Sequence, residues 1–135
     1  MEQTLAMIKP DAVERHLVGA IIEEIEKNDF QITAIRTLRL TGTAAAQFYR
    51  AHQGKPYFES LVQYISSGQI YVLIIEKNDA VESWRQLMGP ARLELAESGT
   101  LRRRYAIDVQ KNSVHGADSP DTALNEIKFF FGEGK

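Results

Sequence analysis

The sequence contains no cysteine among its 135 residues. Disulfide bonds, thiolate catalysis and thiolate metal sites are therefore excluded, and a reducing compartment such as the cytoplasm is expected. The N-terminus lacks the basic start and the long apolar core of a signal peptide. The longest apolar run, residues 70–75, is far too short to cross a bilayer. We therefore expect a cytoplasmic protein that does not enter the membrane.

An excess of charge of one sign is also missing, because the formal net charge is only -2. The chain as a whole has no electrostatic attraction to nucleic acid or to acidic membranes, so any site for an anion must be local. Hydrophobic residues make up 44% and charged residues 25% of the chain. These values are typical of a globular protein, and the length fits one domain over residues 1–135.

The common phosphate-binding and metal-binding motifs do not occur. The sequence has no GxxxxGK[ST] loop and no GxGxxG turn, and it has no HExxH or other paired-histidine spacing. Internal repeats and low-complexity segments are not visible either. Candidate chemistry therefore has to come from individual side chains that the fold brings together.

The pattern of apolar residues predicts alternating strands and helices. Strands are expected at residues 4–8, 32–40 and 69–77, and the continuous apolar run in the last of these favours a central strand covered on both faces. Residues 18–28 have the apolar spacing of an amphipathic helix. Further helices are expected to begin at Thr41, Pro56 and Asp79.

The C-terminal third predicts a loop, a strand and a last helix. Residues 91–99 lack periodicity, residues 105–109 read as a strand, and Ser119 with Pro120 signals a helix start. The tail, residues 132–135, is expected to fray. The order of elements predicts an α+β protein, a ferredoxin-like βαββαβ sandwich with an antiparallel four-stranded sheet covered by helices.

The segment 112–119, Asn-Ser-Val-His-Gly-Ala-Asp-Ser, is the centre of the functional interpretation. It places His115 on a short strand or turn just before the last helix, next to a glycine that allows backbone or ligand to approach the ring. An uncharged imidazole held in one tautomer is a nucleophile near neutral pH. A lone histidine is, however, more often a structural or surface residue, and that alternative stays open.

Several cations accompany this histidine in the sequence. Arginine suits phosphate because its planar fork binds two oxygens at once, but Lys9 alone reads as a solvated cation and the triplet at 102–104 reads equally well as a solvated face. Glu126 lies about two turns into the last helix, where it could fix the tautomer of His115. The residues thus indicate a phosphate-handling site with a histidine, against a structural histidine in a small binding domain. The cationic candidates are Lys9, Arg85, Arg92, Arg102, Arg103 and Arg104.

Ordered motifs along the chain resemble the nucleoside diphosphate kinase family, especially its bacterial members. The resemblance runs from residue 4 to residue 131. The matching motifs are Ala-Met-Ile-Lys-Pro-Asp-Ala-Val at 6–13, Phe-Tyr-Arg-Ala-His at 48–52, Pro-Tyr-Phe at 56–58, Ser-Gly at 67–68, the segment 112–119, and Glu-Ile at 126–127.

The resemblance implies a ping-pong transfer of the terminal phosphate of a nucleoside triphosphate to a nucleoside diphosphate. His115 would be the nucleophile and phosphohistidine carrier, and Glu126 would orient its ring. Asn112 with Lys9 would contact the ribose hydroxyls, and Tyr57, a phenylalanine in many relatives, would stack on the base. The implied substrate-binding residues are Lys9, Tyr49, Tyr57, Leu61, Arg85, Ala91, Arg102, Val109 and Asn112.

The resemblance also implies a cofactor and partners. Mg2+ would bridge the nucleotide phosphates rather than occupy a protein cage. The partners would be ATP and other nucleoside di- and triphosphates, with no need for nucleic acid or a membrane. The chain would form a homo-oligomer built from dimers, either a tetramer or a hexamer.

The sequence departs from the family pattern at three places. Ala91 stands where a threonine hydroxyl is expected to touch phosphate, and Arg92 beside it could supply a charged contact instead. Ala117 stands where relatives often carry a serine, and this change removes a possible partner of Glu126. Arg103 and Arg104 replace smaller or acidic residues. A catalytically weakened member, acting as a nucleotide-binding or interaction module, is therefore the alternative. An RNA-binding version is weak, because the third strand lacks an RNP1-like aromatic pattern.

Overall fold

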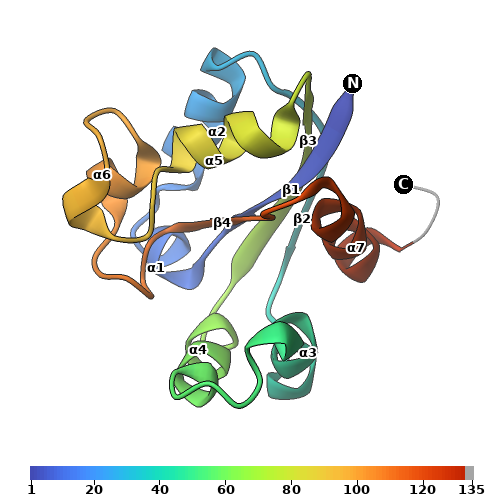
Figure 1. The fold of residues 1–135 in the computed structure, drawn as a ribbon, viewed down its shortest axis with the longest axis vertical. Coiled ribbons are helices and arrows are strands. Elements are labelled where there is room, and N and C mark those ends of the chain that lie inside the picture. Colours follow the sequence, from blue (N-terminus) through green and yellow to red (C-terminus); the bar gives the residue numbers. More distant parts are fainter. Residues whose placement is uncertain (133–135) are drawn as a thin grey trace.

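The computed structural model describes residues 1–132, except for the side chain of Leu93. Its sheet has four strands, β1 (Glu2–Ile8), β2 (Gln31–Leu38), β3 (Ile70–Lys77) and β4 (Val114–Gly116). They are arranged in the order β2-β3-β1-β4, and every neighbouring pair is antiparallel (Figure 1). The predicted antiparallel four-stranded sheet is confirmed. The prediction of a frayed tail falls mostly on residues 133–135, which lie outside the described residues.

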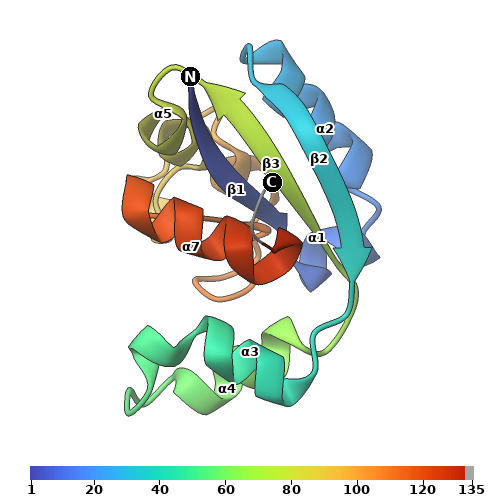
Figure 2. The ribbon, with the colours of Figure 1, turned by 90° about the vertical axis from the view of Figure 1, so that its right-hand side faces the viewer.

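Helices cover both faces of this sheet. Helices α2 and α5 lie on one face and α7 lies across the other, while α3 and α4 form a pair beyond one end of the strands (Figure 2). That pair is inserted between β2 and β3. The helices are α1 (Pro10–Glu14), α2 (Val18–Lys27), α3 (Gly42–Phe48), α4 (Phe58–Ile65), α5 (Ala80–Met88), α6 (Leu101–Tyr105) and α7 (Pro120–Phe131), with 3-10 turns η1 (Arg50–His52) and η2 (Leu93–Leu95).

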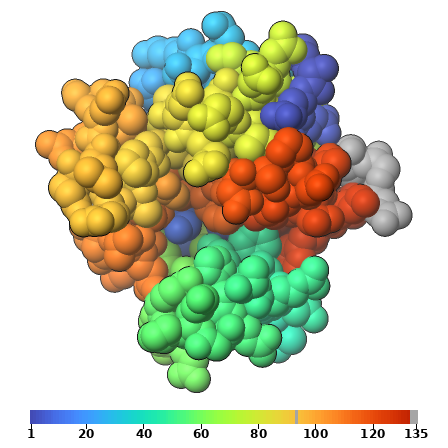
Figure 3. Space-filling view, viewed as in Figure 1, coloured from blue at the N-terminus to red at the C-terminus, as the bar shows by residue number. Residues whose placement is uncertain are grey.

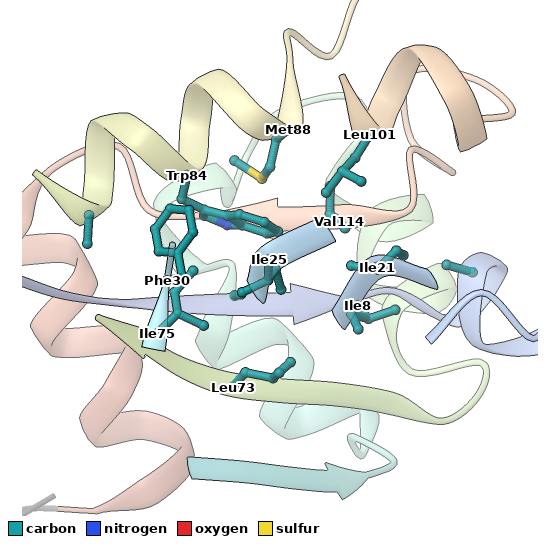
Figure 4. Close-up of a cluster of buried hydrophobic side chains, with 13 residues drawn as sticks. Ile8, Ile21, Ile25, Phe30, Leu73, Ile75, Trp84, Met88, Leu101 and Val114 are labelled. Atoms are coloured by element: carbon teal, nitrogen blue, oxygen red, sulfur yellow. The ribbon is translucent and has the colours of Figure 1, made fainter. Parts of the chain in front are cut away.

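The side chains of β1 and β3 alternate between two apolar clusters, one on each face of the sheet. Beneath α2 and α5, Trp84 packs edge-on against Phe30 with ring centroids 6.4 Å apart (Figure 4). On the other face, α3, α4 and α7 cover a second cluster that includes Tyr49 and Ile127. The double coverage explains why residues 70–75 form a continuous apolar run.

Helix starts follow the predicted caps at two positions and differ at a third. The Thr41 hydroxyl accepts a hydrogen bond from the amide of Ala44, and Ser119 caps α7 in the same way. The prediction that the Asp79 side chain caps α5 is wrong. Asp79 adopts a left-handed backbone with φ 56°. The amide of Val81, in the first turn of α5, donates its hydrogen bond to the carboxylate of Glu2 at 2.8 Å instead of to Asp79.

The strand predicted at residues 105–109 is also wrong. Residues 101–105 form helix α6 instead. Thr100 is its N-cap, and the Thr100 hydroxyl accepts a hydrogen bond from the amide of Arg103. Asp108 then folds the following segment into a turn, because its carboxylate accepts from the amides of Gln110 and Lys111. Local hydrogen bonds from side chains thus replace the expected strand pairing.

Candidate active site

His115 lies in the middle of β4, opposite Met7 of β1. Its backbone carbonyl accepts from Nε1 of Trp84 at 3.2 Å, and its ring is in edge-to-face contact with Phe48 and Tyr49, at centroid distances of 5.3 and 6.1 Å. Nε2 of the ring lies 2.9 Å from Oε2 of Glu126. The ring is therefore fixed through Nε2, and Nδ1 is the nitrogen not engaged by the carboxylate.

A hollow of about 300 Å³ opens beside this ring. Figure 3 shows it between the green surface of the α3–α4 pair and the orange and red surface of the C-terminal part of the chain. The hollow is therefore formed where the inserted helix pair faces β4 and the start of α7. It is lined by Phe48, Tyr49, Ala51, His52, His115, Gly116, Ala117, Asp118, Thr122 and Glu126.

The glycine after the histidine is required by packing rather than by access to the ring. A Cβ atom on Gly116 would lie 2.4 Å from Cδ1 of Trp84 and 2.7 Å from Cε of Met88. The sequence interpretation, in which Gly116 allows close approach to the imidazole, therefore gave an incomplete reason. Its main role is to let α5 pack against β4.

Two polar atoms beside the hollow are buried without a hydrogen-bond partner in the described part of the chain. They are Oε1 of Glu126 and the hydroxyl of Tyr49. Burial, and then the negative charge of Glu126, raise the pKa of Tyr49, so this hydroxyl keeps its proton and can act as a donor. Ala117, 2% exposed, lines the same hollow and offers Glu126 no hydroxyl.

Lys9 follows directly after β1 and is buried rather than solvated. Its Nζ donates to Oδ1 of Asn112 at 2.9 Å, and only 5% of the lysine is exposed. Burial, and then the positive charge of Arg102, lower the pKa of Lys9 to about 7, although Asp11 opposes the shift. The reading of Lys9 as a solvated cation is thus wrong, and its pairing with Asn112 agrees with the family-based expectation.

Asp11 organises the loop that carries Asn112, and sequence reasoning gave it no role. Its carboxylate accepts from the Ser113 hydroxyl at 3.0 Å, from Arg15 at 3.1 Å, and from the Tyr64 hydroxyl. Ser113 has a left-handed backbone with φ 76°, and its carbonyl accepts from the amide of Lys9 at 2.9 Å. The available signal was an acidic residue three positions after a buried strand and two positions after a candidate lysine.

The arginine triplet divides into residues with different surroundings. Arg102 is largely buried and donates to the carbonyls of Gly89 and Val114, each at 2.9 Å. Burial lowers the pKa of Arg102 to about 10, which leaves it charged at neutral pH. Arg104 pairs with Glu24 at 3.0 Å. The interpretation of the triplet as one solvated face therefore fails for Arg102.

Arg85, Ala91 and Arg102 line a second hollow of about 540 Å³. Arg92, which we considered as a substitute for the missing threonine contact, is 71% exposed and pairs with Glu94 at 2.8 Å. The structure thus gives Arg92 a local partner at the surface. Ala91 lines the hollow together with its loop neighbours Gly89 and Pro90.

The remaining predicted site residues differ in exposure. Tyr57 is 44% and Val109 63% exposed, whereas Leu61 is buried at 9%. The carbonyl of Val109 accepts from Nδ2 of Asn112 at 2.9 Å, which places it beside the Lys9–Asn112 pair. The hydroxyl of Tyr57 lies 2.7 Å from Nδ1 of His52. His52 lines the histidine hollow, and sequence reasoning assigned it no role although it belongs to a matching motif.

Residues 1–132 lack the features of a membrane-spanning helix and of a metal cage. Within residues 1–132, none of the helices is long and apolar enough to cross a membrane. The same residues contain no group of three or more histidine, aspartate or glutamate side chains placed to hold a metal ion. The second hollow carries two arginines, Arg85 and Arg102, whose guanidinium groups suit phosphate oxygens, whereas the histidine hollow carries hydroxyls together with the carboxylates of Asp118 and Glu126.

Known proteins match this chain over its full length. The family model described as nucleoside diphosphate kinase matches residues 2–135. A nucleoside diphosphate kinase of Histophilus somni (strain 2336) is 48% identical over 135 residues, which cover 100% of this chain and 96% of that protein. One of Pasteurella multocida (strain Pm70) is 46% identical, with 100% and 97% covered.

Solved structures agree with these sequence matches. A nucleoside diphosphate kinase of Aquifex aeolicus superposes with a TM-score of 0.95 at 36% identity, covering 98% of this chain and 96% of that one. A halophilic nucleoside diphosphate kinase of Halobacterium salinarum, in complex with CDP, superposes with a TM-score of 0.93 at 35% identity, with 98% and 88% covered. The ferredoxin-like prediction is therefore confirmed.

Proposed function

Because this chain belongs to the nucleoside diphosphate kinase family, we propose that it moves phosphate through His115. The chain is a phosphotransferase that passes the terminal phosphate of a nucleoside triphosphate to a nucleoside diphosphate. The observation that carries the assignment to His115 is the contact of 2.9 Å between its Nε2 and Oε2 of Glu126. When Nε2 carries the proton and donates a hydrogen bond to the carboxylate, the lone pair of Nδ1 is free to attack phosphorus.

The proposed reaction has two half-reactions at the same nitrogen. Nδ1 of His115 forms a bond to the terminal phosphorus, and the bond from that phosphorus to the bridging oxygen of the nucleoside diphosphate breaks. The diphosphate leaves, and an oxygen of a second nucleoside diphosphate attacks the phosphohistidine and restores the free ring. Glu126 keeps the imidazole in one orientation and stabilises it while the phosphate is attached.

Charge around the transferring group is the second requirement of phosphoryl transfer, which depends more on positioning and electrostatics than on acids and bases. We propose that Lys9, Arg85 and Arg102 surround the phosphates and that the Tyr49 hydroxyl donates to them. This is supported by the Tyr49 hydroxyl and by Nε of Arg102, which are buried and have no hydrogen-bond partner within residues 1–132. Such donors, fixed before substrate arrives, stabilise developing charge without reorganising.

The nucleoside would be held by a separate set of residues. Asn112 with Lys9 would contact the ribose hydroxyls, and Tyr57 would stack on the base with Leu61 and Val109 beside the nucleotide. Stacking uses a π-face that every base has, so broad base tolerance is expected. The exposed ring of Tyr57 supports its role. The relative of Halobacterium salinarum was solved in complex with CDP, which supports nucleotide binding by this chain.

Mg2+ is proposed to arrive with the nucleotide. The arginines that line the second hollow, Arg85 and Arg102, fit phosphate oxygens rather than a bare metal ion. Mg2+ keeps much of its water and prefers phosphate ligands. The ion would neutralise part of the phosphate charge. Ala91, in the hollow with Arg85 and Arg102, would lie beside the phosphates without supplying a hydroxyl.

We further propose that residues 1–135 act as one domain in a homo-oligomer built from dimers, either a tetramer or a hexamer, in the cytoplasm. Strand β2 is at one edge of the sheet, and Ile35 on it is 52% exposed, which supports a contact there with a second copy. The cytoplasmic location goes with nucleotide substrates that circulate inside the cell.

The test of His115 is covalent labelling. The protein is mixed with ATP labelled in its terminal phosphate, quenched in alkali, and checked for label that acid removes. The wild-type chain should take up label and lose it on addition of a nucleoside diphosphate. Labelling that persists in His115→Ala would place the phosphate on another residue and contradict the proposed mechanism. Normal affinity of the wild-type chain for ADP, with no measurable turnover, would favour the binding-only alternative.

A further inference from the structure

We propose that His52 is a positioning residue for nucleotide binding, because a hydrogen bond with the Tyr57 hydroxyl holds the ring that stacks on the base. Nδ1 of His52 lies 2.7 Å from the Tyr57 hydroxyl oxygen. The inference rests on the proposed function, since that function gives Tyr57 its stacking role. It concerns the hydroxyl of Tyr57 rather than the aromatic ring itself.

The chain between the two residues folds so that their side chains face each other. Gly54 has φ 87°, a left-handed conformation that glycine adopts without strain. The amide of His52 donates to the carbonyl of Tyr49 at 2.8 Å, and the amide of Lys55 donates to the carbonyl of His52 at 3.0 Å. The two rings consequently lie 5.5 Å apart at an interplanar angle of 61°.

The backbone of Tyr57 is fixed, but its ring has few other constraints. Its carbonyl accepts from the amide of Leu61 at 2.9 Å and from the Ser60 hydroxyl at 3.0 Å. The residue is nevertheless 44% exposed. An exposed aromatic side chain samples several rotamers unless something fixes its tip. The His52 contact supplies that fixed point.

His52 also connects the two ends of the proposed nucleotide site. It lines the same hollow as His115, and its ring lies 5.9 Å from that of Tyr49, which is itself 6.1 Å from that of His115. The base-stacking ring is thereby tied to a side chain of the phosphate hollow. This arrangement sets the position of the base relative to the reacting phosphate before the nucleotide binds, which reduces the entropy lost on binding.

The test compares a ligand that has a base with one that lacks it. Calorimetry measures the dissociation constants of ADP and of inorganic pyrophosphate, both with Mg2+, for the wild-type chain and for Tyr57→Phe. The variant keeps the ring and removes only the hydroxyl. It should bind ADP about threefold to tenfold more weakly, the usual effect of one lost hydrogen bond. Its affinity for pyrophosphate should not change.

Variants of His52 show whether the effect of the hydroxyl passes through that residue. In a His52→Leu background, Tyr57→Phe should cause no further loss of ADP affinity, because the partner of the hydroxyl is already absent. In a His52→Asn background, an amide group stands at the position of Nδ1, and the effect of Tyr57→Phe should return. The KM for ADP should follow the same pattern while kcat stays nearly constant.

Two results would overturn the inference. One is equal ADP affinity of Tyr57→Phe and the wild-type chain, and the other is an equal loss in the wild-type and His52→Leu backgrounds. Either result, with labelling of His115 intact, rejects the His52 role and leaves the proposed function standing. A wild-type chain that binds neither ADP nor ATP would reject both.

Discussion

Nε2 of His115 and Oε2 of Glu126 lie 2.9 Å apart, while the other oxygen of the same carboxylate, Oε1, is buried with no hydrogen-bond partner among the described residues. One half of the carboxylate therefore holds the imidazole, and the other half is not anchored. Ala117 lines the same hollow and offers this oxygen no hydrogen-bond donor from its side chain. The orientation of the His115 ring, the proposed nucleophile, depends on a glutamate that is itself only partly fixed.

The first prediction concerns this unanchored oxygen. Ala117→Ser places a hydroxyl in the hollow, where it can donate to Oε1 of Glu126. We expect His115 to be phosphorylated about threefold to tenfold faster, because the net free energy of one hydrogen bond corresponds to a change in rate of that size. Rapid-quench measurement of the phosphoenzyme with ATP tests it. Ala117→Cys is the control, because a thiol of similar size is a weak donor, and an equal gain in both variants would contradict the explanation.

The second prediction follows from the lowered pKa of Lys9. With a pKa of about 7, this side chain is mostly neutral at pH 8 in the free protein. A bound phosphate stabilises the ammonium form and raises the pKa, so binding takes up a proton. ADP affinity should fall as pH rises above 7, by up to about tenfold per pH unit.

Calorimetry of ADP binding at pH 8, in two buffers of different ionisation enthalpy, measures the proton uptake directly. The wild-type chain should take up a substantial fraction of a proton. Lys9→Met, which keeps the length of the side chain and cannot titrate, should bind more weakly and without that uptake. Identical uptake in the two proteins would assign the proton to another group.

The third prediction concerns packing behind the histidine. Gly116→Ala should destabilise the protein by about 1 to 3 kcal/mol, because the added Cβ would overlap the indole of Trp84. Gly19→Ala is the matched control, since a Cβ on this residue of α2 meets nothing within 4 Å. It should stabilise the helix by about 0.5 to 1 kcal/mol. Denaturant unfolding of both variants measures the difference, and equal effects would contradict the packing argument.

The fourth prediction concerns Asp11. Asp11→Asn removes the charge that Arg15, Ser113 and Tyr64 share, and we expect a loss of about 1 to 3 kcal/mol in the free energy of unfolding. ADP should also bind more weakly, because the loop that positions Asn112 loses its anchor. Glu23→Gln breaks an exposed ion pair with Lys27 and should change neither quantity measurably. A fully stable Asp11→Asn protein with normal ADP binding would reject the role of Asp11.

The fold could be predicted well where apolar spacing decides the structure. The strand at 70–75 and the helices that begin at Thr41 and Ser119 follow directly from burial and capping. The errors at Asp79 and at residues 105–109 have a different cause. There the backbone adopts a left-handed turn or follows side-chain hydrogen bonds, and neither leaves a periodic signal.

From the residues alone the site could be predicted only as a list of residue types, whereas the family resemblance also paired Lys9 with Asn112. The spacing of His115 and Glu126 suggested their contact, but nothing in the sequence shows that Lys9 is buried against Asn112, since more than a hundred residues separate them. The division of the arginine triplet is equally invisible, because the burial of Arg102 depends on the carbonyls of Gly89 and Val114. Tertiary packing, rather than local pattern, determines these environments.

The most direct test of the account is to identify the nitrogen that carries the phosphate. Protein labelled with 15N in its histidines is phosphorylated with ATP, held at alkaline pH, and studied by nuclear magnetic resonance for phosphorus–nitrogen coupling. We predict coupling to Nδ1 of His115, its disappearance when ADP is added, and its absence from His115→Ala. Phosphate on Nε2, or on a different residue, would contradict the assignment, because Nε2 is the atom that Glu126 holds.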